Sequence, residues 1–167
     1  PDYPSLEQQQ NFTTAHLKNF PGQFAYATSF NITNFDDSGW QQRTINYLKE
    51  SFAKGAIGVK VWKNIGMEYK NKNGRFVMID DPRLDPIFDF IEKNNKTVIG
   101  HLGEPKNCWL PLEEMTVKND KEYFEKHPEY HMFLHPEYPS YEQQLKARDN
   151  MLEKHPNLRF DGAHLAS

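Results

Sequence analysis

Helical and strand-like segments alternate along this chain of 167 residues, and the alternation limits the folds it can adopt. The strand-like segments are short and rich in β-branched or aromatic residues, whereas the helical ones carry apolar residues three or four positions apart. This order predicts an α/β fold with parallel strands joined by right-handed crossovers. The predicted helices span 5–19, 40–54, 82–94 and 140–154, and the predicted strands span 24–30, 56–62, 97–102 and 158–165.

Capping residues mark the ends of several predicted helices. Ser5 and Ser140 precede the first and last helices, and a serine hydroxyl accepts a hydrogen bond from the free N–H groups of a first turn. Glu142 or Gln143 stands near the capping-box position of the last helix. Gly55 follows the second helix as a C-cap.

The composition is that of an ordinary globular protein. Hydrophobic residues make up 37% of the chain and charged residues 26%. The net charge of -3 comes with scattered Lys and Arg, which argues against nucleic acid as a partner and favours a small-molecule substrate. No apolar run is long enough for a membrane span, and the lone Cys108 leaves the compartment open. The oligomeric state is equally open.

Two predicted strands end in a histidine. His101 closes the run Thr97–Leu102, and His164 closes the last strand. In parallel α/β folds the carboxyl ends of the strands carry the chemistry, so both histidines are candidate metal ligands or acid/base groups of one site. No Gly-rich phosphate loop follows any strand, which counts against a nucleotide-binding open sheet and favours half of a (β/α)₈ barrel.

Three segments carry a resemblance to a known family: GVKVWKNIGM at 58–67, DPRLDPIFDFIEKNNKTVIGHLGEP at 81–105, and HPEYPSYEQQLKARDNMLEKHPNLRFDGAHLAS at 135–167. They resemble the metal-dependent amidohydrolase superfamily, in particular the amidohydrolase-related group that also contains decarboxylases. The third segment is the most specific, because a helix followed by HP, a short LRF strand and GAHL is an unusual combination.

The resemblance implies a distorted TIM-type barrel with one or two divalent metal ions, zinc being the expected one. It makes residues 1–167 a single partial barrel domain, about strands three to six of eight, truncated at both ends, with an insertion at 106–139 after the fifth strand. His101 matches the fifth-strand metal ligand and His164 the sixth-strand residue, which is a ligand or a catalytic proton carrier. No H-x-H pair is present, and nothing follows to supply the eighth-strand aspartate.

Several other residues are candidates for binding substrate or for orienting a metal ligand. Period-two alternation places Lys60 and Trp62 on one face of their strand, towards the barrel interior, and leaves Lys63 in solvent. Glu104 follows His101 closely, and His135 ends the long insertion. In some members of that family a carbamylated lysine or a glutamate near the fourth strand bridges two metals. The resemblance therefore makes Lys60 and Lys63 candidates for this role.

The resemblance predicts a hydrolase for the intact protein, in which a metal-activated water attacks an amide, ester or lactone. Two alternatives stay open: a non-oxidative decarboxylase of the same superfamily, in which His164 delivers a proton, and a non-catalytic ligand-binding barrel. The 167-residue piece alone is expected to be inactive, because it lacks the other ligands. The substrate and the identity of the metal are not readable from these residues.

Overall fold

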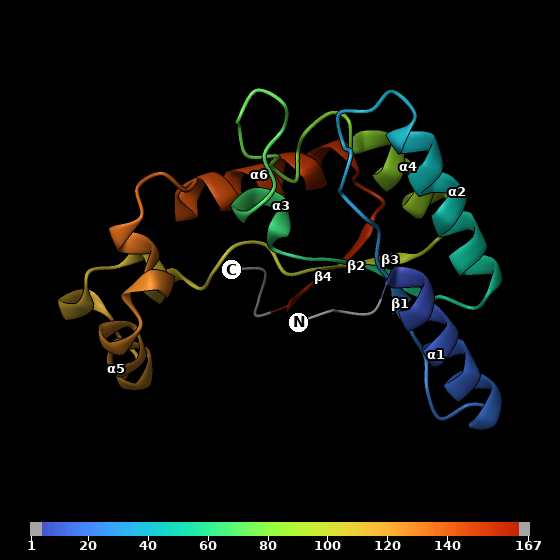
Figure 1. Cartoon of the computed structure of the whole chain (residues 1–167), viewed down its shortest axis with the longest axis horizontal. Helices are drawn as coiled ribbons and strands as arrows, with labels where there is room; N and C mark the ends of the chain where they lie inside the picture. Colours follow the sequence, from blue (N-terminus) through green and yellow to red (C-terminus); the bar gives the residue numbers. More distant parts are fainter. Residues whose placement is uncertain (1–4, 164–167) are drawn as a thin grey trace.

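A four-stranded parallel sheet forms the centre of the protein (Figure 1), seen in a computed structural model that describes residues 5–163. The strand order is β1-β2-β3-β4, so each strand lies beside its neighbour in the sequence. The register pairs Gly58 with Ala27 on one side and with Thr97 on the other. The strands span Ala27–Thr28 (β1), Gly58–Val61 (β2), Thr97–Gly100 (β3) and Arg159–Gly162 (β4).

Helices α2, α4 and α6 cover one face of this sheet, and α1 lies beside β1 (Figure 1). The alternating helices and parallel strands confirm the α/β class predicted from the sequence. The α-helices span Leu6–Asn19 (α1), Trp40–Ala53 (α2), Asn64–Met67 (α3), Asp85–Lys93 (α4), Lys118–Lys126 (α5) and Tyr141–Lys154 (α6). Short 3-10 turns at Lys106–Trp109, Leu112–Glu114, Pro128–Tyr130 and Met132–Leu134 shape the segment around α5.

The two faces of the sheet differ in burial. Val59 and Val61 are buried in the core that the strands form with the helices, beside residues such as Leu48 and Phe88. On the opposite face, called here the open face, Lys60 is half-buried and Trp62 is exposed. This is the alternation that the period-two pattern predicts.

Two capping boxes start α1 and α6 where the sequence places them. The Ser5 hydroxyl accepts from the Gln8 N–H at 3.2 Å, and the Ser140 hydroxyl accepts from the Gln143 N–H at 3.3 Å. Each glutamine side chain accepts in return from its serine N–H. Local sequence alone therefore fixes these two helix starts.

Other predicted boundaries shift. The third predicted helix starts at Asp85 instead of Pro82, because a turn comes first: the Asp81 carboxylate accepts from the Arg83 N–H at 3.0 Å. The strands are shorter than their apolar runs, and Phe24 lies outside β1 and is 57% exposed. A turn at residues 72–74 lies between Lys70 and Phe76, which form an antiparallel bridge.

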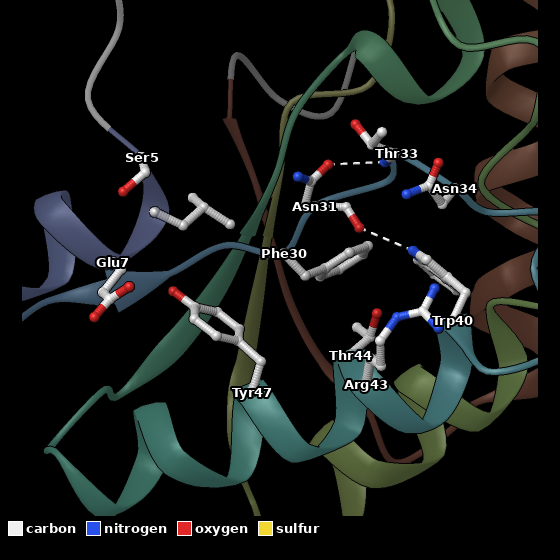
Figure 2. A pocket seen from close by; sticks show the side chains of 11 residues that line it. Ser5, Glu7, Phe30, Asn31, Thr33, Asn34, Trp40, Arg43, Thr44 and Tyr47 are labelled. Atoms are coloured by element: carbon white, nitrogen blue, oxygen red, sulfur yellow. Dashed lines mark hydrogen bonds between the residues drawn. The ribbon is translucent and has the colours of Figure 1, made fainter.

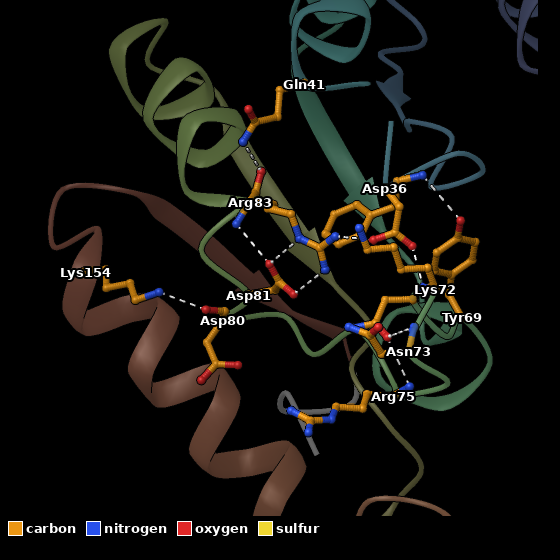
Figure 3. Close-up of polar contacts among 12 residues, drawn as sticks. Asp36, Gln41, Tyr69, Lys72, Asn73, Arg75, Asp80, Asp81, Arg83 and Lys154 are labelled. Atoms are coloured by element: carbon orange, nitrogen blue, oxygen red, sulfur yellow. Dashed lines mark hydrogen bonds and ion pairs between the residues drawn. The ribbon is translucent and has the colours of Figure 1, made fainter. Parts of the chain in front are cut away.

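A polar cluster around Arg83 ties the loop after β1 to the segment before α4 (Figure 3). The guanidinium donates to Asp36 at 2.5 Å and to both carboxylate oxygens of Asp81 at 3.1 and 3.0 Å, and it lies 3.9 Å from the centre of the Phe35 ring. Desolvation alone would raise the pKa of Asp36, but hydrogen bonds from Arg83 and from the Lys72 N–H outweigh it and hold that pKa below its ordinary value. The cluster fixes two loops at the carboxyl ends of the strands.

A small core joins the segment 106–139 to α3. Met67, Cys108 and Met132 form this core, with Trp109 and Phe124 against it. The Cys108 thiol donates to the Tyr130 carbonyl at 2.9 Å, and burial raises its pKa to about 11. Across residues 5–163, no helix is long and apolar enough to cross a membrane.

Candidate functional site

His101 lies at the carboxyl end of β3, directly after the last residue of the strand. Its backbone N–H donates to the Val61 carbonyl at 3.1 Å, which continues the pairing between β2 and β3 by one residue. The imidazole meets the indole of Trp62 edge to face, with ring centroids 4.6 Å apart and an interplanar angle of 77°. Because both residues are anchored by the sheet, this pair has a defined geometry.

Lys60 adds a cation to this pair. Its ammonium group lies 5.6 Å from the centre of the Trp62 ring, on the open face of β2. The side chain also lines a cavity of about 250 Å³ between α1 and the sheet, together with Ser29 and Tyr47. Lys60 thus stands between a small cavity and the aromatic pair at the strand ends.

Lys63 and Glu104 join the loops that follow β2 and β3. Their side chains form an ion pair, and the two are 28% and 23% exposed. The expectation that Lys63 points into solvent is therefore wrong, because a carboxylate 41 residues away in the sequence holds it. The backbone carbonyl of Glu104 accepts from the indole N–H of Trp109 at 3.2 Å, which fixes the loop further.

His135 makes its contacts within the long segment after β3. One ring nitrogen lies 3.1 Å from the Pro128 carbonyl oxygen, and the other lies 3.3 Å from Glu137. The ring also meets Tyr138 edge to face. These contacts give His135 a structural role in this segment, and its expected part in the site stays a prediction.

His164 lies outside the described residues. Its pairing with His101 on one metal ion, with nitrogens roughly 3–3.5 Å apart, therefore stays a prediction. Within residues 5–163, no group of three or more His, Cys, Asp or Glu side chains gathers to hold a metal. The imidazole of His101 is a suitable ligand by its chemistry, but the ligand set within this range is incomplete.

A second pocket lies beside the loop after β1 (Figure 2). It measures about 490 Å³ and shares Leu6 and Tyr47 with the cavity of Lys60. The indole N–H of Trp40 donates to the Asn31 carbonyl at 2.9 Å and shapes one wall. This pocket was not predictable from the sequence. Its walls come from α1, α2 and the loop between β1 and α2, and no single sequence motif contains these residues.

Gln144 is another residue that the sequence did not single out. It belongs to α6, it is buried, and its amide donates to the Gly66 carbonyl at 2.9 Å. A glutamine in a polar helix carries no signal of such a contact, because the partner is 78 residues away.

No protein-family model and no curated protein matches the chain. Two solved structures of 2,6-dihydroxybenzoate decarboxylase are similar, one from Rhizobium and one in complex with 2,6-dihydroxybenzoate. Each superposes with a TM-score of 0.58 at 14% sequence identity, over 95% of this chain and 45% of the solved chain. The chain thus spans less than half of the length of these enzymes and shares the fold of the matched part.

Proposed function

We propose that the chain is part of a (β/α)₈ barrel, approximately strands three to six, in an enzyme of the amidohydrolase superfamily. The uninterrupted β1-β2-β3-β4 order with helices on one face supports this, since strands of a barrel follow one another in this way. The similar decarboxylases extend over more than twice the length of the chain, which leaves room for the other strands.

We infer that the reaction is non-oxidative decarboxylation of an aromatic or unsaturated carboxylic acid. One observation carries this: the exposed indole of Trp62 contacts both the Lys60 ammonium group and the His101 imidazole at the strand ends. An aromatic ring packs well against an indole face, and an ammonium group attracts a carboxylate. The fold shared with 2,6-dihydroxybenzoate decarboxylase points to the same substrate class.

The proposed roles follow from these positions. Trp62 holds the ring of the substrate, Lys60 attracts its carboxylate, and the Lys63–Glu104 pair borders the site. His164 delivers a proton to the ring carbon as the bond to the carboxylate breaks and carbon dioxide leaves.

His101 is a candidate ligand for a divalent metal, zinc first, and a bound metal would supply positive charge to orient the substrate. Within residues 5–163, no three His, Cys, Asp or Glu side chains gather to complete a ligand set.

A hydrolase is the second candidate. The segments 81–105 and 135–167 resemble the metal-dependent amidohydrolase superfamily, which includes hydrolases in which a metal-activated water attacks an amide, ester or lactone. The two reactions differ in their products, which makes them separable in one assay.

The test uses the full-length protein that carries this chain. It is incubated with 2,6-dihydroxybenzoate and other hydroxybenzoates, and in parallel with simple lactones and esters. Release of carbon dioxide that is lost in Trp62→Ala supports the decarboxylase, whereas ester or lactone hydrolysis without carbon dioxide release establishes the second candidate. The matched control is Phe133→Ala, because Phe133 is as exposed as Trp62 but belongs to the segment around α5. Absence of both activities in metal-supplemented protein would contradict the proposed function.

A further inference from the structure

Gln144 reaches from α6 to the two loops that border the candidate site. It is only 6% exposed, and its side-chain amide donates to the Gly66 carbonyl at 2.9 Å. The Gly66 N–H donates to the Val77 carbonyl at 2.7 Å, so both backbone groups of Gly66 have partners. A buried amide bonded in this way fixes the position of a loop, because losing the bond leaves a buried carbonyl unpaired.

Two glycines with positive φ pack directly against Gln144. Gly66 has a φ of 96° and Gly103 a φ of 74°, a region that L side chains rarely adopt. A Cβ at Gly66 would lie 2.5 Å from the Gln144 Oε1 atom, and a Cβ at Gly103 would lie 3.2 Å from its Cγ atom. Both loops therefore approach the same side chain closely.

These two loops carry the candidate residues. Gly66 follows Lys63 by three positions, and Gly103 lies between His101 and Glu104. The loops meet in the ion pair of Lys63 with Glu104, while Gln144 contacts both of them through their glycines. One side chain thus contacts both the loop after β2 and the loop after β3.

We propose that Gln144 is a positioning residue. It holds these two loops in place relative to each other and so sets the placement of His101, Lys63 and Glu104. The effect on turnover rests on the proposed function, whereas the effect on the loops does not. Gln144 contacts the two glycines and acts on the candidate residues through them.

The neighbouring glutamine provides a matched control. Gln143 is exposed, and its side chain accepts from the Ser140 N–H at the start of α6. Gln143→Met and Gln144→Met make the same chemical change one position apart. Only the second removes the donor to Gly66 while keeping the length of the side chain.

The test measures hydrogen exchange in the full-length protein for peptides that cover residues 64–68 and 101–105. In Gln144→Met we expect exchange to rise by about tenfold in residues 64–68, which lose one buried hydrogen bond. Exchange in residues 101–105 should rise too, because the ion pair of Lys63 with Glu104 joins the two loops. In Gln143→Met the rise should stay at the start of α6. Exchange in both loops that equals the wild type, or a uniform rise across the protein, would overturn the proposal.

Kinetics give a separate readout where the enzyme turns over. Misplaced groups lower kcat more than they raise KM, so Gln144→Met should lose at least about tenfold in kcat while Gln143→Met keeps its rate. Gln144→Glu keeps length and polarity but cannot donate when ionised, and it should resemble Gln144→Met. An inactive wild type would contradict the proposed function alone, because the exchange experiment still decides the role of Gln144.

Discussion

The contact between His101 and Trp62 gives the candidate site its most specific feature at the scale of single residues. Edge-to-face packing at a centroid distance of 4.6 Å restricts rotation of the imidazole. The backbone hydrogen bond from His101 to Val61 fixes the main chain from which the ring projects. A ligand held in this way loses little entropy when a metal binds. An exposed loop histidine lacks these restraints.

The first prediction concerns His101 in the full-length protein. His101→Ala should lower bound zinc by at least about tenfold and abolish metal-dependent turnover, because one ligand is removed. The measurements are metal analysis and kinetics on the same preparations. His127→Ala is the control, since His127 lies at the end of α5 beside Glu129. Full activity and full metal content in His101→Ala would contradict the assignment.

The second prediction concerns His164. His164→Ala should lower turnover strongly, whereas metal content should fall only if the site holds two ions. A variant with normal turnover would exclude His164 as proton donor. Comparing metal content with that of His101→Ala separates a ligand from a proton carrier.

The third prediction concerns the pH dependence set by Cys108. Burial raises the pKa of this thiol to about 11, so the folded protein holds the proton more tightly than the unfolded chain. The contribution to stability is complete below the ordinary thiol pKa and is lost as pH rises towards 11. Denaturant unfolding between pH 8 and 11 should show a steeper loss of stability in the wild type than in Cys108→Ala. Equal dependence of the free energy of unfolding on pH in the two proteins would contradict this prediction.

At the scale of elements, the Arg83 cluster holds together two loops that the strands alone do not connect. The bond to Asp36, 47 residues away, and the packing on Phe35 join the two loops, whereas the two bonds to Asp81 are local (Figure 3). The Arg83 side chain is 36% exposed, and solvent screening therefore weakens each of its ion pairs.

The fourth prediction follows from this cluster. Arg83→Met should lower the free energy of unfolding by about 1–2 kcal/mol, because charged hydrogen bonds of a partly exposed group are lost. Arg75→Met is the matched control, since Arg75 is exposed and lies nearby in Figure 3. Equal midpoints of denaturant unfolding for Arg83→Met and the wild type would rule out a stabilising role. The difference should shrink as pH falls and Asp36, whose pKa is lowered, takes up a proton.

Elements whose signals are local were predicted well. Ser5 and Ser140 carry their capping boxes within three residues, so α1 and α6 begin where the sequence indicates. The alternation in β2 likewise predicts which face carries Lys60 and Trp62. Each of these features depends on neighbours in the sequence alone.

Elements that depend on distant partners were not predictable. The short helix α3 contains Gly66 in a left-handed conformation, and Gln144 from α6 packs against it. Lys63 turns from solvent because Glu104 lies within reach only once β2 and β3 are paired. Both cases require the tertiary structure, which periodicity and capping signals do not contain.

At the scale of the whole molecule, the open face and the sheet edges are the surfaces most prone to self-association. Trp62 is 47% exposed there, and within residues 5–163 no strand pairs with the outer edge of β1 or of β4. Unpaired edges and exposed apolar side chains promote association. The similar decarboxylases, of which the chain covers 45%, extend well beyond these strands.

The fifth prediction is that the 167-residue chain, purified by itself, self-associates through the open face. Sedimentation velocity should show species larger than the monomer, and Trp62→Glu should shift them towards monomer because it places a carboxylate on that face. Phe133→Glu is the matched control, since Phe133 is 51% exposed but belongs to the segment around α5. Association that disappears in Phe133→Glu and persists in Trp62→Glu would place the contact on that segment and contradict the prediction.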